Sequence, residues 1–170
     1  MQQQEAAAPA FGFLTAVESP THGVFGGYLL VDGWGRPLEF HCTAPVKVSR
    51  AQQILYGATL PSHLHGRQIG AALLAEGSVA PAVVLTDRDA MLTARSHTPL
   101  PMAFVRRRDA ATDEPPVGGF ALGDACVSPH TSDSAGAEAI RARLEELSAA
   151  VDLTEPFERI RLAIEEAQRH

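Results

Sequence analysis

The sequence FGFLTAVESPTHGVFGGYLLVDGWGRPLEFHCT, residues 11–43, contains three apolar segments that are separated by turns. Residues 11–17 are almost continuously apolar, which is typical of a strand buried on both faces. Residues 24–31 form a second such segment, and its pair Gly26-Gly27 indicates a bulge or a close approach of other backbone. Both connections are too short for a crossover, so we expect the three strands to form an antiparallel meander.

The third segment, residues 38–43, alternates strictly between apolar and polar side chains. Such alternation is typical of an outer strand with one buried and one wetter face. The side chains that we expect toward the core are Leu38, Phe40 and Cys42. Those that we expect on the wetter face are Glu39, His41 and Thr43.

Helical signals follow the meander. Ser49 and Gln52 have the spacing of a capping box, and Gly57 is a stop signal for that short helix. A second helical stretch is predicted from Pro61 to about Gly77.

A βαβ unit comes next in the chain. Residues 82–86 predict a fully apolar strand, and Asp87 at its carboxyl end can cap a helix over residues 88–95. Residues 102–105 return as a strand, and the connection is long enough for a right-handed parallel crossover.

The last third of the chain divides into a loop and two helices. Residues 106–134 are rich in Pro, Gly, Asp and Ser, with a short strand predicted around Phe120. Residues 135–170 predict two amphipathic helices with a break near residues 152–155. Their apolar faces consist of Ile140, Leu144, Leu147 and Val151 in the first helix and of Leu153, Phe157, Ile160 and Ile164 in the second.

The fold class that these elements predict is α/β, with a mixed sheet (α+β). An antiparallel three-stranded meander is followed by a parallel βαβ unit and two C-terminal helices. This order matches ribonuclease-H-like topology, in which the third strand is an edge. A profilin-like or GAF-like sensor sheet is the alternative, with the DG hairpin joining two central strands. We expect residues 1–10 to be a flexible tail, residues 11–134 the mixed α/β domain, and residues 135–170 a helical hairpin packed on it.

Composition excludes several classes of protein. The 170 residues carry a formal net charge of −6, which argues against general nucleic-acid binding. There is no basic, apolar N-terminal leader and no apolar stretch of membrane-spanning length, so we expect a cytoplasmic protein without a membrane partner. Cys42 and Cys126 form no C-x-x-C pair, which excludes a four-thiolate zinc site, and no cofactor is predicted.

Asp87 is the first weak catalytic candidate. A ribonuclease-H-like nuclease needs clustered carboxylates that hold two divalent metal ions, and Asp87 stands where the acid after the fourth strand is expected. The first strand offers only Glu18, and the helix that should supply another acid has Gln52 and Gln53. Because this set is incomplete, we favour a helix cap as the role of Asp87.

Glu39 and His41 are the other weak catalytic candidates. A period of two places them on one face of a strand, where the acid can orient the imidazole. Cys42 is expected on the opposite face, so it cannot form a nucleophile–base pair with His41. We favour a surface ion pair between Glu39 and His41.

Weak metal-ligand candidates are His41, His63, His65 and Asp87. His63 and His65 would share a metal ion only in extended backbone, because a helix places them about 200° apart. Residues 106–108, three arginines after the last core strand, can hold a phosphate or an acidic partner.

No complete catalytic set is found, so we favour a non-enzymatic protein-interaction or adaptor domain, a subunit of a larger assembly. Its partner, or a second copy, would bind through the C-terminal helices. One alternative is a metal-dependent hydrolase or nuclease with a degenerate site around Asp87, which would need a divalent metal. Another is a small-molecule sensor with a pocket lined by Tyr28, Phe40 and Tyr56.

Overall fold

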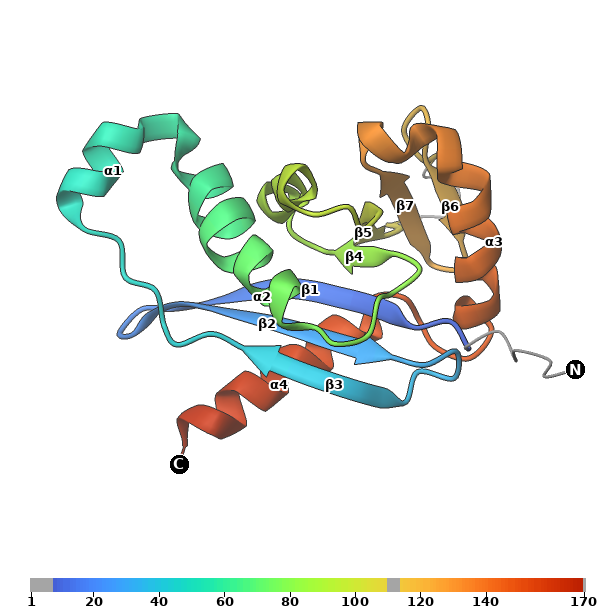
Figure 1. Cartoon of the computed structure of the whole chain (residues 1–170), viewed down its shortest axis with the longest axis horizontal. Coiled ribbons are helices and arrows are strands. Elements are labelled where there is room, and N and C mark those ends of the chain that lie inside the picture. The colour runs from blue at the N-terminus through green and yellow to red at the C-terminus, as the bar shows by residue number, and fades with distance from the viewer. Residues whose placement is uncertain (1–7, 110–113, 170) are drawn as a thin grey trace, which may run out of the picture.

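The computed structural model describes residues 8–109 and 114–169. Its centre is a seven-stranded mixed sheet in the order β3-β2-β1-β4-β5-β7-β6 (Figure 1). The first five strands are β1 (Phe11–Ser19), β2 (Gly23–Val31), β3 (Pro37–Cys42), β4 (Val84–Thr86) and β5 (Met102–Arg107).

The predicted topology is confirmed for these five strands. β1, β2 and β3 form an antiparallel meander, while β1, β4 and β5 are parallel. The order β3-β2-β1-β4-β5 is ribonuclease-H-like, with β3 at the edge and β1 beside β4 in the centre. The two central strands are mostly apolar because side chains cover both of their faces, and their threonines Thr15 and Thr86 are buried as well.

A hairpin extends the sheet beyond β5, where the sequence had predicted a long loop with one short strand. β6 (Phe120–Leu122) is that strand, and β7 (Ala125–Pro129) pairs with it and with β5. Cys126 is therefore a buried strand residue, although its surroundings in the sequence suggest a loop. Part of the predicted loop, residues 110–113, lies outside the described residues.

Helices cover both faces of the sheet (Figure 1). The chain between β3 and β4 forms α1 (Arg50–Tyr56), the short η1 (Gly57–Thr59), the π-helix η2 (Ser62–Ala71) and α2 (Ala72–Glu76). The crossover from β4 to β5 is the 3-10 helix η3 (Asp89–His97), and η4 (Thr131–Gly136) leads into α3 (Ala137–Ser148) and α4 (Glu155–Gln168). Across the described part of the chain, no helix combines the length and apolarity needed to cross a bilayer.

Two apolar cores result, one on each face. Side chains from η2, α2 and η3 pack with Leu14 and Leu30 on one face. Side chains from α3 and α4 pack with Phe13 and Leu29 on the other. We call these the η2 face and the α4 face.

Gly26 and Gly27 show how closely the two layers approach the meander. A Cβ atom on Gly26 would overlap the side chain of Ile69 in η2, and one on Gly27 would overlap Ile160 in α4. The prediction of a bulge or of a close approach by other backbone is therefore wrong: side chains from both faces approach these glycines, and the register shift lies between Leu30 and Val31.

The apolar faces of the C-terminal helices pack against the sheet of the same chain. α4 lies across β1 and β2, with Phe157 edge-on to Phe13 at 5.3 Å between ring centroids. α3 lies on the same face but over β6, near the other end of the sheet, so the two helices cover separate strands (Figure 1). Core packing therefore accounts for the apolar periodicity of both helices.

The burial predicted for the faces of β3 is wrong. Leu38 is 48% exposed, Phe40 is 40% exposed, and the Cys42 residue is exposed, while Glu39 and His41 are half-buried. The reason is which helix extends to the edge strand. α4 contacts β1 and β2, whereas α2, on the opposite face, contacts β2 and β3, so β3 is covered on the η2 face. A two-residue period cannot tell which layer extends to the edge strand.

Candidate functional site

Asp87 lies on the α4 face, where β4 ends. The parallel register pairs Leu14 with Thr86, so the next residues, Thr15 and Asp87, are neighbours. The Thr15 hydroxyl donates to Asp87 Oδ1 at 2.6 Å, and Arg161 of α4 donates to Oδ2. The carboxylate is therefore held between a buried strand hydroxyl and a helix guanidinium.

The helix-cap role favoured for Asp87 is wrong. Arg88 is the residue that precedes η3, and no side chain caps that helix. The Thr86 hydroxyl, and not the Asp87 carboxylate, accepts from the Arg88 backbone N–H, at 3.1 Å. The Asp87 carboxylate points toward α4 instead, where it accepts hydrogen bonds from Thr15 of the sheet and Arg161 of the helix.

The surroundings of Asp87 are poorly suited to divalent metal. Two-metal chemistry needs several carboxylates around each ion, and the strand position beside Asp87 carries the neutral Thr15. Arg161 brings positive charge to the other carboxylate oxygen. In the described ranges 8–109 and 114–169, no group of three or more His, Cys, Asp or Glu residues is placed to bind a metal ion.

A cavity of about 520 Å³ opens beside Asp87, at the carboxyl ends of β4 and β5. Its charged and polar lining consists of Asp87, Arg106, Arg107, Thr154, Glu155, Glu158 and Arg161. Ligands bind at this end of the strands in open α/β sheets. The charges are internally balanced: Arg107 lies 3.7 Å from Asp152, and Arg161 contacts Glu158 as well as Asp87.

Glu18 lies on the opposite face from Asp87. Alternation along β1 places it on the side of Leu14 and Ala16, which belong to the η2 core. Its carboxylate lies 3.7 Å from the Arg88 guanidinium. The structure therefore does not bring Glu18 and Asp87 together.

Glu39 and His41 form a pair on the η2 face of β3. His41 Nε2 lies 3.0 Å from Glu39 Oε1, and the same carboxylate accepts from the backbone N–H groups of Ser78 and Val79. The hydrogen bond from His41, followed by that from the Ser78 backbone, lowers the pKa of Glu39 to about 2. β2 separates the pair from β1, so Glu39 and His41 do not converge with Asp87.

His63 and His65 both lie in η2, and their helical backbone points them in different directions. His63 stacks on Tyr56 with 4.4 Å between ring centroids. His65 is buried, and its Nδ1 has no hydrogen-bond partner among the residues that the structure describes. Burial, reinforced by the nearby charge of Arg88, lowers the pKa of His65 and so favours the neutral ring.

The three aromatic residues suggested for a sensor pocket do not line one cavity. Tyr28 is buried in the core of the η2 face, where burial raises the pKa of its hydroxyl. Phe40 lies beside Gly27 on the α4 face, and Tyr56 ends the outlying helix α1. These three side chains therefore do not form the lining that the sensor hypothesis expects.

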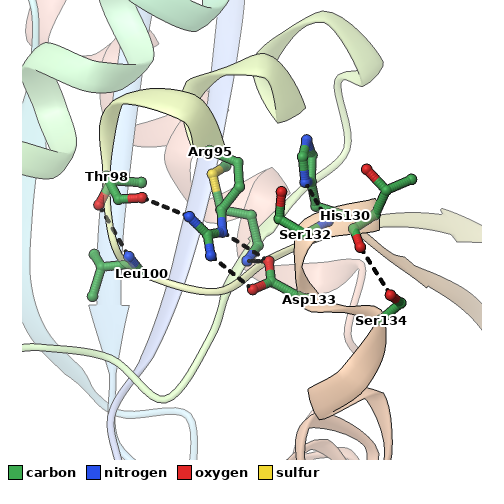
Figure 2. Close-up of polar contacts among 9 residues, drawn as sticks. Arg95, Thr98, Leu100, His130, Ser132, Asp133 and Ser134 are labelled. Atoms are coloured by element: carbon green, nitrogen blue, oxygen red, sulfur yellow. Dashed lines mark hydrogen bonds and ion pairs between the residues drawn. The ribbon is translucent and has the colours of Figure 1, made fainter.

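A second aspartate–arginine pair, which the sequence did not single out, joins η3 to η4 (Figure 2). Arg95 donates to both carboxylate oxygens of Asp133, at 2.9 and 3.0 Å, and also to the Thr98 carbonyl. The Met102 backbone N–H donates to the same carboxylate at 3.0 Å. Burial alone would raise the pKa of Asp133, but the hydrogen bonds from Arg95 and Met102 together lower it.

Comparisons with known proteins assign no family. No family model matches the chain, and no curated protein matches it either. Among solved structures, the Argonaute of Marinitoga piezophila in complex with 5′ OH guide RNA aligns with 88% of this chain, at 9% identity and a TM-score of 0.43. The same Argonaute with guide RNA and target DNA aligns with 74%, at 10% identity and a TM-score of 0.34. This chain spans about a quarter of the Argonaute chain, 27% and 23% in the two cases.

Proposed function

We propose that this chain is a non-enzymatic interaction domain, a protein-binding subunit of a larger assembly. The observation that carries the proposal is α1, which projects from the body of the molecule and has no buried residue (Figure 1). Ile54 and Leu55 in this helix are 67% and 83% exposed. Two adjacent large apolar side chains on a projecting helix are typical of a contact surface for a partner.

The surroundings of Asp87 support a non-enzymatic role. A carboxylate whose two oxygens already accept from a hydroxyl and a guanidinium is a poor metal ligand. The overall charge of −6 favours a protein partner over nucleic acid.

The partner surface proposed here is α1 and not the C-terminal helices. The apolar faces of α3 and α4 belong to the core, so deleting residues 152–170 would expose Phe13 and Leu29 and disturb the fold. Substitutions in α1 remove no core contact and are therefore the cleaner test.

The experiment compares the wild type with the double variant Ile54→Asp/Leu55→Asp. The tagged full chain is purified from its native source, and bound proteins are identified by mass spectrometry and confirmed with purified components. We expect a stoichiometric partner that the double variant loses, while Leu162→Asp, an exposed position in α4, retains it. A wild-type chain that binds no protein, or a partner held equally by the double variant, contradicts the proposal.

The metal-dependent hydrolase remains the competing hypothesis, because the cavity beside Asp87 lies at the ligand-binding end of the parallel strands. It predicts hydrolysis of phosphodiester substrates with Mg²⁺ or Mn²⁺, and loss of that activity in Asp87→Ala. Metal-dependent turnover that disappears in this variant would replace the interaction proposal.

A further inference from the structure

The outer edge of β3 is open. Among residues 8–109 and 114–169, β3 pairs with β2 alone and ends the sheet. The Thr43 N–H donates to the Gly26 carbonyl, so the backbone groups of Thr43, His41 and Glu39 point toward β2. By the same alternation, the backbone groups of Phe40 and Cys42 point away from the sheet.

An open strand edge is a template for another strand. The register shift beside Leu30 and the imino nitrogen of Pro37 limit the regular part of the edge to residues 39–43. The exposed side chain of Phe40 lies within this segment, and that of Leu38 immediately precedes it. The segment is therefore short, apolar on one face and unprotected by lysine.

We propose that β3 pairs with β3 of a second copy of this chain, antiparallel and with the twofold axis at Phe40. In this register each Glu39 lies opposite His41 of the partner subunit, and each Leu38 lies opposite the partner subunit's Cys42. The outward backbone groups of the two Phe40 residues bond to one another. The paired sheets form one continuous sheet across the dimer.

Charge selects this register over its neighbours. Centring the axis on Glu39 places two carboxylates opposite each other, and centring it on His41 places two imidazoles opposite each other. Only the axis at Phe40 brings acid and imidazole together twice, whereas two carboxylates directly opposite each other destabilise a strand pair. A register shifted by one residue, in which Glu39 faces Phe40 of the partner subunit, fails for another reason. It would align the η2 face of one sheet with the α4 face of the other.

The first experiment measures mass against concentration by sedimentation and light scattering. We expect the full chain to associate reversibly into a dimer. Trp34, the single tryptophan of the chain, is 68% exposed in the hairpin before β3, and its fluorescence should change over the same concentration range. Phe40→Glu places like charges at the twofold axis and should weaken association about tenfold or more. Leu162→Glu is the matched control and should leave it unchanged.

The second experiment tests the register by disulfide cross-linking in a Cys42→Ser background, where Cys126 is buried. Glu39→Cys mixed with His41→Cys should cross-link rapidly, because facing Cβ atoms in a non-hydrogen-bonded pair lie about 5 Å apart. Either variant alone should not. The proposal is overturned if the wild-type chain stays monomeric at the highest concentration measured. It is also overturned if Glu39→Cys alone cross-links as fast as the mixture of Glu39→Cys and His41→Cys. Because α1 takes no part in this contact, its double variant should dimerise normally, which separates failure here from failure of the proposed function.

Discussion

Two aspartate–arginine pairs lie at opposite ends of the parallel strands. Asp87 follows β4 and pairs with Arg161, whereas Asp133 holds the N–H of Met102 at the start of β5 and pairs with Arg95. The Asp133 side chain is 8% exposed and its carboxylate is bonded by Arg95 and by backbone. The Asp87 side chain is 20% exposed and borders a cavity of about 520 Å³.

This difference separates a structural ion pair from a residue that lines a cavity. A buried carboxylate is stable only when its acceptors are satisfied, as they are for Asp133. Asp87 is also paired, but its partner comes from the rim of an open cavity, so the pair can exchange with solvent. We therefore expect the Asp133–Arg95 pair to stabilise the fold more than the Asp87–Arg161 pair does.

The largest effect is expected for Asp133→Asn. The substitution leaves Arg95 half-satisfied in a buried site and should lower the free energy of unfolding by about 3 kcal/mol. Urea unfolding measures the change. Asp124→Asn, at an exposed turn, is the matched control and should change stability by less than about 0.5 kcal/mol. If both variants lost the same free energy of unfolding, the Asp133–Arg95 pair would not be a structural ion pair.

The effect of Asp133→Asn should depend on pH. Because the pKa of Asp133 is lowered in the fold, its contribution is present above the unfolded pKa of about 3.9 and is lost as the pH falls through the folded pKa. The gap in unfolding free energy between wild type and variant should therefore be constant near neutral pH and narrow below about pH 4. Urea unfolding curves of both proteins from neutral pH to below about pH 4 measure this gap. A gap that widens in acid would contradict the lowered pKa of Asp133.

A smaller loss is expected for Thr15→Val. The buried hydroxyl donates to Asp87, and its removal should cost about 1 kcal/mol in the free energy of unfolding. The isosteric control is Thr21→Val in the exposed turn between β1 and β2, which should be nearly neutral. If Thr15→Val were also neutral, the bond to Asp87 would contribute little to the fold.

The smallest effect is expected for Asp87→Asn. The amide can still accept from Thr15, and the ion pair with Arg161 is partly exposed, so we expect a loss of about 0.5 kcal/mol. About 1 M NaCl should reduce this difference further by screening. A loss as large as that of Asp133→Asn would show that the two pairs are equivalent in stability.

Local patterns in the sequence predicted most of the elements. Continuous apolar segments predicted the central strands β1 and β4, and the capping box at Ser49 predicted the start of α1. The two-residue spacing of Glu39 and His41 predicted that their side chains meet, and they do so at 3.0 Å, although both are half-buried rather than at the surface. β7 was missed because it is five residues long within a turn-rich segment, which local pattern does not separate from a loop.

The sequence by itself determined the antiparallel pairing of β1, β2 and β3, because their connections are too short for a crossover, and it permitted the parallel pairing of β4 with β5. It also determined the apolar faces of α3 and α4, because helical periodicity is a local property. Only the tertiary structure decided that Thr15 and Arg161 flank Asp87, since the three residues come from distant segments. It likewise decided that Leu38 and Phe40 are exposed, because that depends on where α4 ends across the sheet.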